Sequence, residues 1–85
     1  MDTPDVKAGE QLALKFGERV RQVRLQKGIT SQEYLAELSG LHRTFIGRVE
    51  RGETNITLEN IRKIAAGLGI SLAELFEPFK DVLDG

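Results

Sequence analysis

The chain has 85 residues, no cysteine and a formal net charge of −1, which is typical of one small domain and excludes disulfides and thiolate metal sites. No apolar run reaches the ~18 residues that a membrane helix needs, and Met1–Glu10 lacks the apolar segment of a signal peptide. We therefore expect a single cytoplasmic domain over residues 1–85, with no membrane partner, no small-molecule substrate and no cofactor.

Helical periodicity dominates the sequence, and strand signals are weak. The first predicted helix runs from about residue 10 to Gln26, after a flexible N-terminal extension over residues 1–10. Gly28 is expected to end this helix. Its apolar stripe, at three- and four-residue spacing, consists of Leu12, Phe16, Val20 and Val23.

Two short helices follow, and a glycine ends each of them. The first is expected over residues 32–39, with either Thr30 or Ser31 as its N-cap, because both fit a capping pattern. The second is expected over residues 43–51, before Gly52 in a left-handed conformation. The apolar members of the two helices are Leu35, Ala36, Leu38, Phe45, Ile46 and Val49.

The C-terminal third predicts two further helices. The longer runs from about Leu58 to Leu68 with Thr57 as its cap, and the shorter from Leu72 to about Phe76. We expect the core of the domain to span residues 16–76 and a C-terminal tail to span residues 77–85. The apolar stripe of the longer helix consists of Leu58, Ile61, Ile64, Ala65 and Leu68.

The charges are unevenly distributed along the chain. Ten basic and six acidic side chains lie between Lys15 and Lys63, whereas the two flanks carry two basic and seven acidic side chains. A basic centre with acidic ends suits a protein that presents one face to phosphates. Charges that only solvate surface helices give the same pattern, so the charge distribution alone leaves both interpretations open.

The stretch from Ser31 to Gly52 is organised as a helix-turn-helix, in which the second helix enters the major groove of DNA. A tight turn around Gly40 joins its two short helices, and the small side chain of Ala36 lets them cross closely. Ile46 and Val49 are expected to point inward. The outer side is then left to His42, Arg43, Thr44, Gly47, Arg48 and Arg51.

Arginine and threonine on this outer side suit base recognition. Arginine can donate two hydrogen bonds to guanine, and threonine can contact a base edge or a thymine methyl. We therefore expect Arg43, Thr44 and Arg48 to read bases, with phosphate contact or plain solvation as the alternatives. Gly47 in mid-helix costs about 1 kcal/mol relative to alanine, so we expect it to permit a close approach to DNA or to the preceding helix. His42 lacks partners for a metal site, which leaves a DNA contact or an exposed turn residue.

Five motifs follow one another between Phe16 and Phe76. They are Gly17-x-x-Val20-Arg21-x-Val23-Arg24, Ser31-Gln32-Glu33-x-Leu35-Ala36, Gly40-Leu41-x-Arg43-Thr44-x-Ile46, Glu50-Arg51-Gly52 and Ile64-Ala65-x-x-Leu68-Gly69-Ile70. In this order and spacing they resemble the Cro/phage-repressor (XRE) helix-turn-helix family. The run from Leu41 to Gly52 also resembles the controller proteins of restriction–modification systems. The resemblance implies an all-α, five-helix, lambda-repressor-like DNA-binding domain with a central helix-turn-helix.

The resemblance also implies roles for individual residues. The base-reading surface of the family corresponds here to His42, Arg43, Thr44, Gly47 and Arg48. The phosphate-contacting positions correspond to Gln32, Arg51, Thr54 and Asn55. Gln32 also corresponds to a glutamine that braces the recognition helix. A structural ion pair between the first and third helices corresponds to Arg24 and Glu50.

Three departures from the family pattern are visible. One residue is inserted between Gly28 and Gln32. Gly67 replaces a helix former, which should weaken the fourth helix. His42 stands where Ser or Asp, which are better N-caps, are frequent, and this leaves the identity of the first base contact open.

We expect a homodimeric transcriptional regulator that binds a pseudo-palindromic operator in double-stranded DNA. The apolar C-terminal segment, which also includes Val82 and Leu83, exceeds what the core needs, and such surplus often marks an interface. The expected dimer interface consists of Leu72, Leu75, Phe76 and Phe79. Two alternatives remain: the antitoxin of a toxin–antitoxin pair, which would hold its toxin with residues 77–85, and an interaction adaptor without DNA affinity. An enzyme is disfavoured, because the chain has one histidine, no phosphate loop and no paired acid–base set.

Overall fold

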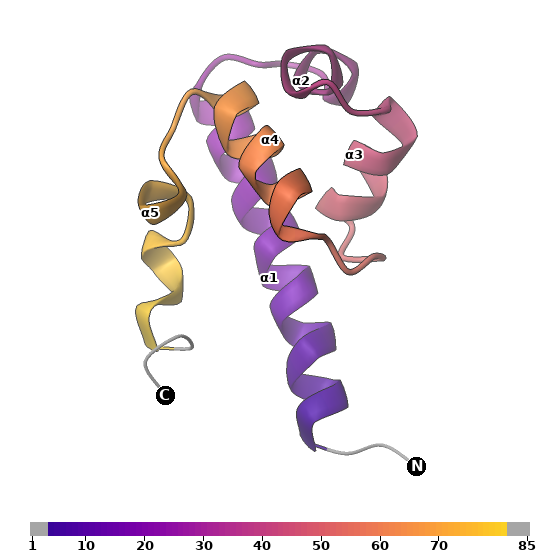
Figure 1. Ribbon diagram of the computed structural model, residues 1–85, viewed down its shortest axis with the longest axis vertical. Coiled ribbons are helices and arrows are strands. Elements are labelled where there is room, and N and C mark those ends of the chain that lie inside the picture. Colours follow the sequence, from indigo (N-terminus) through magenta and orange to yellow (C-terminus); the bar gives the residue numbers. More distant parts are fainter. Residues whose placement is uncertain (1–3, 82–85) are drawn as a thin grey trace.

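The computed structural model describes residues 4–81, and within them every regular element is helical (Figure 1). The all-α, five-helix fold predicted from the sequence is confirmed. In Figure 1, α1 forms the long axis, with α3 on one side of it and α5 on the other, and both contact it. The elements are α1 (Pro4–Gln26), α2 (Gln32–Ser39), α3 (Arg43–Glu50), α4 (Leu58–Leu68), α5 (Leu72–Leu75) and the short 3-10 helix η1 (Glu77–Phe79).

Helix α1 is longer than the sequence pattern predicted. It begins at Pro4 instead of near residue 10, so residues 4–10 are helical and do not form a loose extension. Proline is well suited to the first position of a helix, because its fixed φ is helical and its missing N–H has no partner there anyway. The apolar stripe used for the prediction starts only at Leu12, which explains why it missed the preceding turns. Leu12 itself is 36% exposed.

Each helix contributes one of the largest fully buried side chains. These are Val20, Leu35, Ile46, Ile64 and Leu75. The contacts between α1 and α3 are close because Gly17 has no side chain: a Cβ at this position would lie 2.6 Å from the carbonyl oxygen of Glu50. Any other residue at Gly17 would push α3 away from α1. The core therefore fixes where α3 sits on the bundle.

The segment after α5 is part of this core. Phe79 is buried, and the rings of Phe16, Phe76 and Phe79 form a chain with centroid separations of 5.6 and 5.8 Å. Arg19 on α1 also binds α5, since its guanidinium donates to the carbonyl oxygens of Leu75 at 3.0 Å and Glu74 at 2.7 Å. The core thus continues beyond the predicted limit at residue 76, while residues 82–85 lie outside the described part of the chain.

For the helices that follow α1, the observed boundaries agree with the predicted ones to within one residue. The Ser31 hydroxyl accepts a hydrogen bond from the backbone N–H of Tyr34, so Ser31 is the N-cap of α2 and Thr30 is not. Thr57 caps α4 in the same way. Helix α3 ends at Glu50, and Gly52 has the predicted left-handed conformation with φ of 71°.

Besides Leu12, two other side chains assigned to apolar stripes are exposed instead. Leu38 is 45% and Leu58 is 85% exposed, because the buried stripe of α2 passes through Leu35 and Ser39, and that of α4 starts only at Ile61. No helix within residues 4–81 is long and apolar enough to cross a membrane.

Gly67 has a packing role that the sequence did not reveal. A Cβ at Gly67 would lie 3.0 Å from the backbone nitrogen of Ser39, so this glycine lets the end of α2 approach α4 closely. Gly67 is therefore unfavourable for helix propensity, but it permits a closer contact between α2 and α4.

Candidate nucleic-acid interface

The turn between α2 and α3 sets the direction of α3. Gly40 adopts φ of 70°, and the backbone N–H of Leu41 donates to the carbonyl oxygen of Ala36 at 3.0 Å, which closes the C-terminus of α2. Helix α3 then packs against both α2 and α1. Leu41, the turn residue that follows Gly40, is partly buried against the core.

Helix α3 has one buried and one exposed side. Ile46 and Val49 are buried, and this is the inward direction that the sequence predicted. The exposed residues are three of the predicted base readers, Arg43, Thr44 and Arg48. They lie at the first, second and sixth positions of the helix, so all of them face outward from the same short element.

His42 provides the N-cap of α3. Its Nδ1 accepts a hydrogen bond from the backbone N–H of Thr44 at 3.1 Å, which satisfies a donor at the start of the helix. The imidazole therefore takes the place of the Ser or Asp hydrogen bond expected there. With Nδ1 engaged as an acceptor, Nε2 is the ring nitrogen left for another contact, since His42 is exposed.

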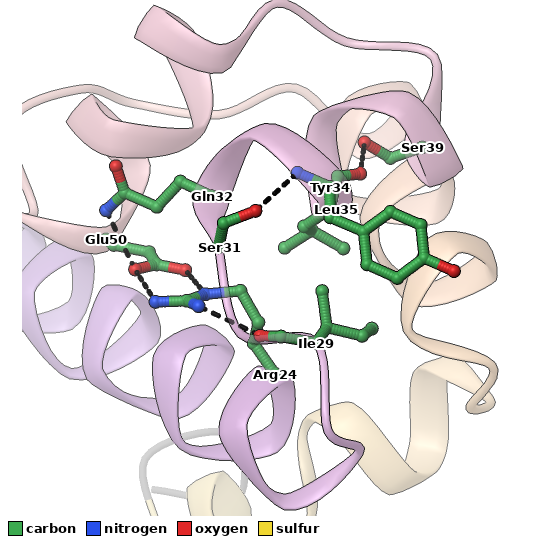
Figure 2. Close-up of polar contacts among 8 residues, drawn as sticks. All are labelled: Arg24, Ile29, Ser31, Gln32, Tyr34, Leu35, Ser39 and Glu50. Carbon is green, nitrogen blue, oxygen red and sulfur yellow. Dashed lines mark hydrogen bonds and ion pairs between the residues drawn. The ribbon is translucent and has the colours of Figure 1, made fainter.

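A buried polar network holds α3 in this orientation (Figure 2). Arg24 donates from Nε to one oxygen of Glu50 at 2.7 Å and from Nη2 to the other at 3.1 Å. Its Nη1 donates to the carbonyl oxygen of Ile29 at 3.0 Å, which also ties down the loop before α2. This is the ion pair that the resemblance implied, and its side chains are 6% and 2% exposed. No buried side-chain polar atom in the described part of the chain lacks a hydrogen-bond partner.

Gln32 joins this network at the start of α2. Its amide nitrogen donates to Glu50 at 3.0 Å, as Figure 2 shows, so one carboxylate connects α1, α2 and α3. Gly47 makes room for the arrangement: a Cβ there would lie 3.2 Å from the Gln32 amide oxygen and 3.1 Å from Nη1 of Arg51. The mid-helix glycine is thus explained by the side chains beside it, including the one from the preceding helix.

Five of the predicted DNA-contacting residues line one shallow hollow between α2 and α3. A sixth lining residue, Glu33, was not among the predicted site residues, because in the sequence it fits the capping pattern of α2. Its position directly after Gln32 was the signal that could have identified it. The hollow is lined by Gln32, Glu33, Arg43, Thr44, Gly47 and Arg51.

The remaining predicted phosphate contacts lie elsewhere. Thr54 and Asn55, in the loop between α3 and α4, line a separate hollow against Gly9, Glu10 and Ala13 of α1. The Thr54 hydroxyl donates to the carbonyl oxygen of Asn55 at 3.1 Å. The structure therefore places these two residues beside the N-terminal half of α1, apart from the hollow that holds the α3 residues.

Arg51 lines the hollow between α2 and α3, and it forms an ion pair with Glu53, which lines the other hollow. Its Nε lies 3.0 Å from a carboxylate oxygen of Glu53, and both side chains are about half exposed. The hydrogen bond from Arg51 lowers the pKa of Glu53, and the same bond raises the pKa of Arg51. A phosphate that contacts Arg51 would have to compete with this carboxylate.

The predicted dimer residues are divided between core and surface. Leu75 and Phe79 are 0% and 3% exposed, so they fill the core of the chain itself and have almost no area left for a partner. Leu72 is 45% exposed and Phe76 is partly buried. Phe76 also lines an apolar groove, together with Leu12, Ile56 and Ile61 among others. The predicted Val82 and Leu83 lie outside the described residues.

The chain is similar in sequence and in structure to known proteins. The helix-turn-helix family model matches residues 20–75. The control protein C.BamHI of Bacillus amyloliquefaciens is 47% identical over 66 residues, which cover 78% of this chain and 82% of that protein. The crystal structure of the restriction-modification controller protein C.AhdI from Aeromonas hydrophila matches with a TM-score of 0.75 and 51% identity, over 79% of this chain and 96% of the other. The chain belongs to the helix-turn-helix (XRE-type) family of DNA-binding transcriptional regulators.

Proposed function

We propose that this regulator binds a pseudo-palindromic operator as a homodimer, with one α3 from each copy in successive major grooves about 34 Å apart. The division of α3 into a buried and an exposed side carries the proposal. Ile46 and Val49 anchor the helix, while the exposed Arg43, Thr44 and Arg48 have the chemistry that reads base edges. His42 caps the start of the same helix and is exposed.

Affinity comes mainly from phosphate contacts in this proposal, and α3 supplies the sequence preference. The phosphate contacts are assigned to Gln32, Arg51, Thr54 and Asn55, which flank α3 on both sides. The hydrogen bond from Arg51, and to a smaller extent the charge of Arg48, lowers the pKa of Glu53, so both arginines lie near this carboxylate. The protein acts by binding in the cytoplasm and performs no catalysis.

We further propose that the chain controls a restriction–modification operon, with its operator in the DNA upstream of its own gene. The similarity to C.BamHI and C.AhdI supports this role, because it extends over more than three quarters of the chain. The dimer is supported by the exposed Leu72 of α5 and by the partly buried Phe76, which lines the apolar groove. Exposed apolar area of this kind often marks an interface.

The proposal is tested by footprinting on the DNA upstream of the gene, together with light scattering on the free protein. A two-fold-symmetric protected region and a mass of twice 9.5 kDa are expected. A monomer that protects a single half-site would overturn the dimer but not DNA binding. An adaptor without DNA affinity would protect nothing even at low salt, and an antitoxin would co-purify with a second protein.

A further inference from the structure

An acidic side chain lies in the middle of the proposed DNA-reading surface. Glu33, the second residue of α2, places Oε2 3.8 Å from Nη1 of Arg43, the first residue of α3. The two side chains are 66% and 70% exposed and line the same hollow as Gln32, Thr44 and Arg51. A carboxylate at this place opposes DNA binding in general, because it repels the phosphates that supply most of the affinity.

The stability of the fold does not explain this pair. Ion pairs between two exposed side chains contribute little, because water screens them and both side chains lose freedom. The first turn of α2 already has a cap in Ser31, which accepts from the backbone N–H of Tyr34 at 3.0 Å. A contribution of Glu33 to the helix dipole is the structural alternative, and it predicts an effect on stability without any effect on base preference.

We propose that Glu33 is a positioning residue for base recognition, which directs the Arg43 guanidinium toward a guanine in the major groove and away from phosphate. This inference rests on the proposed function, since it concerns how that function becomes specific. A guanidinium has five N–H donors in a fixed plane. A carboxylate beside Nη1 occupies one edge of the guanidinium. The N–H donors on the other edges stay available for the O6 and N7 atoms of guanine.

The loose geometry of the pair fits a guiding role. At 3.8 Å the two groups attract each other without a hydrogen bond of ordinary length, so Arg43 stays free to extend into the groove. The pair of Arg51 and Glu53 is different, since its 3.0 Å contact holds the arginine directly. Glu33 therefore limits the directions in which the Arg43 side chain points, but it does not prevent this side chain from extending into the groove.

The test compares Glu33→Gln with Glu37→Gln as a matched control. Glu37 is an exposed acid one turn further along α2, and it does not line the hollow. Each variant and the unmodified chain first select from a pool of duplexes randomised over about 20 base pairs, two turns of DNA. The dissociation constants are then measured for the selected duplex and for versions in which each guanine is replaced in turn.

For Glu33→Gln we expect discrimination at one guanine position to fall about tenfold, within the range that a bidentate arginine contact supplies. Binding to duplex of unrelated sequence should tighten by a few-fold, because one repulsive charge is removed. Glu37→Gln should tighten unrelated binding comparably but keep the discrimination. Thermal unfolding of both variants should match that of the unmodified chain.

A double-variant cycle separates guidance from direct reading. In an Arg43→Ala background, Glu33→Gln should no longer change base discrimination. If the change persists there, the carboxylate itself reads a base, for example a cytosine amino group, and the positioning role is overturned. Equal discrimination by Glu33→Gln and the unmodified chain would also overturn it. If the unmodified chain selects no common sequence at all, the proposed function fails as well, and this outcome is distinct from both.

Discussion

The surface around α3 and the surface around α5 have opposite characters. On α3, buried aliphatic residues alternate with exposed arginines and threonine, so the amino-acid types alone separate inside from outside. Around α5 and η1 the residues predicted to form an interface are all apolar. Residue type therefore does not separate core from surface there, and only tertiary packing does. Leu75 and Phe79 are buried, whereas their neighbour Leu72 is exposed. Polar contrast along a helix is therefore a better guide to a binding surface than apolar content.

The largest expected effect would break the anchored side of α3. Removing Arg24 by substitution with alanine leaves the buried Glu50 carboxylate without its charge partner, which should destabilise the fold by about 3–5 kcal/mol. Urea unfolding followed by circular dichroism measures this loss. Arg62→Ala, which breaks an exposed pair with Glu59, is the control and should change stability by less than about 1 kcal/mol. Equal losses in both variants would contradict the structural role of the buried pair.

A second pair of substitutions sharpens the distinction between core and surface around α5. Leu75→Ala should cost about 2–5 kcal/mol, because Leu75 is fully buried and its truncation leaves a cavity in the core. Leu72→Asp should leave the stability of the monomer nearly unchanged and should weaken the dimer, as measured by sedimentation over a range of concentrations. Leu25→Asp is the matched control, since Leu25 is 48% exposed on α1. A similar loss of dimer in both variants would remove Leu72 from the interface.

The exposed side of α3 is expected to affect binding without affecting folding. Arg43→Ala and Arg48→Ala should each lose about 1–3 kcal/mol of specific DNA affinity. Their melting temperatures should stay close to that of the unmodified chain, because both side chains are exposed. Fluorescence anisotropy on the operator and on unrelated duplex measures the difference. Unchanged operator preference in both variants would show that other residues read the bases.

The smallest expected effect concerns Glu53. The hydrogen bond from Arg51 lowers the pKa of Glu53 in the folded chain, so the pair's slight stabilisation is present above about pH 4.3, the usual value for glutamate. It is lost as the pH falls through the lowered pKa. At neutral pH, Glu53→Gln should therefore release Arg51 and tighten binding to any duplex by a few-fold, measured at low salt. Weaker binding would mean that Glu53 supports the DNA-contacting loop instead.

The sequence predicted the elements well where helix boundaries have a local cause. Thr57 caps α4 and Gly52 takes a positive φ as predicted, and the cap of α2 is Ser31, one of the two candidates, because these effects depend on neighbouring residues only. The early start of α1 was missed, since no apolar stripe extends before Leu12. The exposure of Leu58 was missed as well, because it depends on which turn of α4 first meets the core.

The candidate site was predicted by residue type and only partly by its arrangement. Arg43, Thr44 and Gln32 were identified from the motif, and they line one hollow. The resemblance implied that Gln32 braces the recognition helix, and Gln32 donates a hydrogen bond to Glu50 on α3. The proximity of Glu33 to Arg43 was missed, because it depends on how α2 crosses α3, and local sequence patterns do not encode such tertiary packing.

The separation of anchors from readers on α3 has a consequence for how operators diverge. Ile46, Val49 and Glu50 hold the helix, and none of them belongs to the exposed set at Arg43, Thr44 and Arg48. Exchanging the exposed set for other polar side chains leaves every anchoring contact intact. New target sequences can therefore evolve, or be engineered, on this scaffold by a few surface changes, without a search for a new fold.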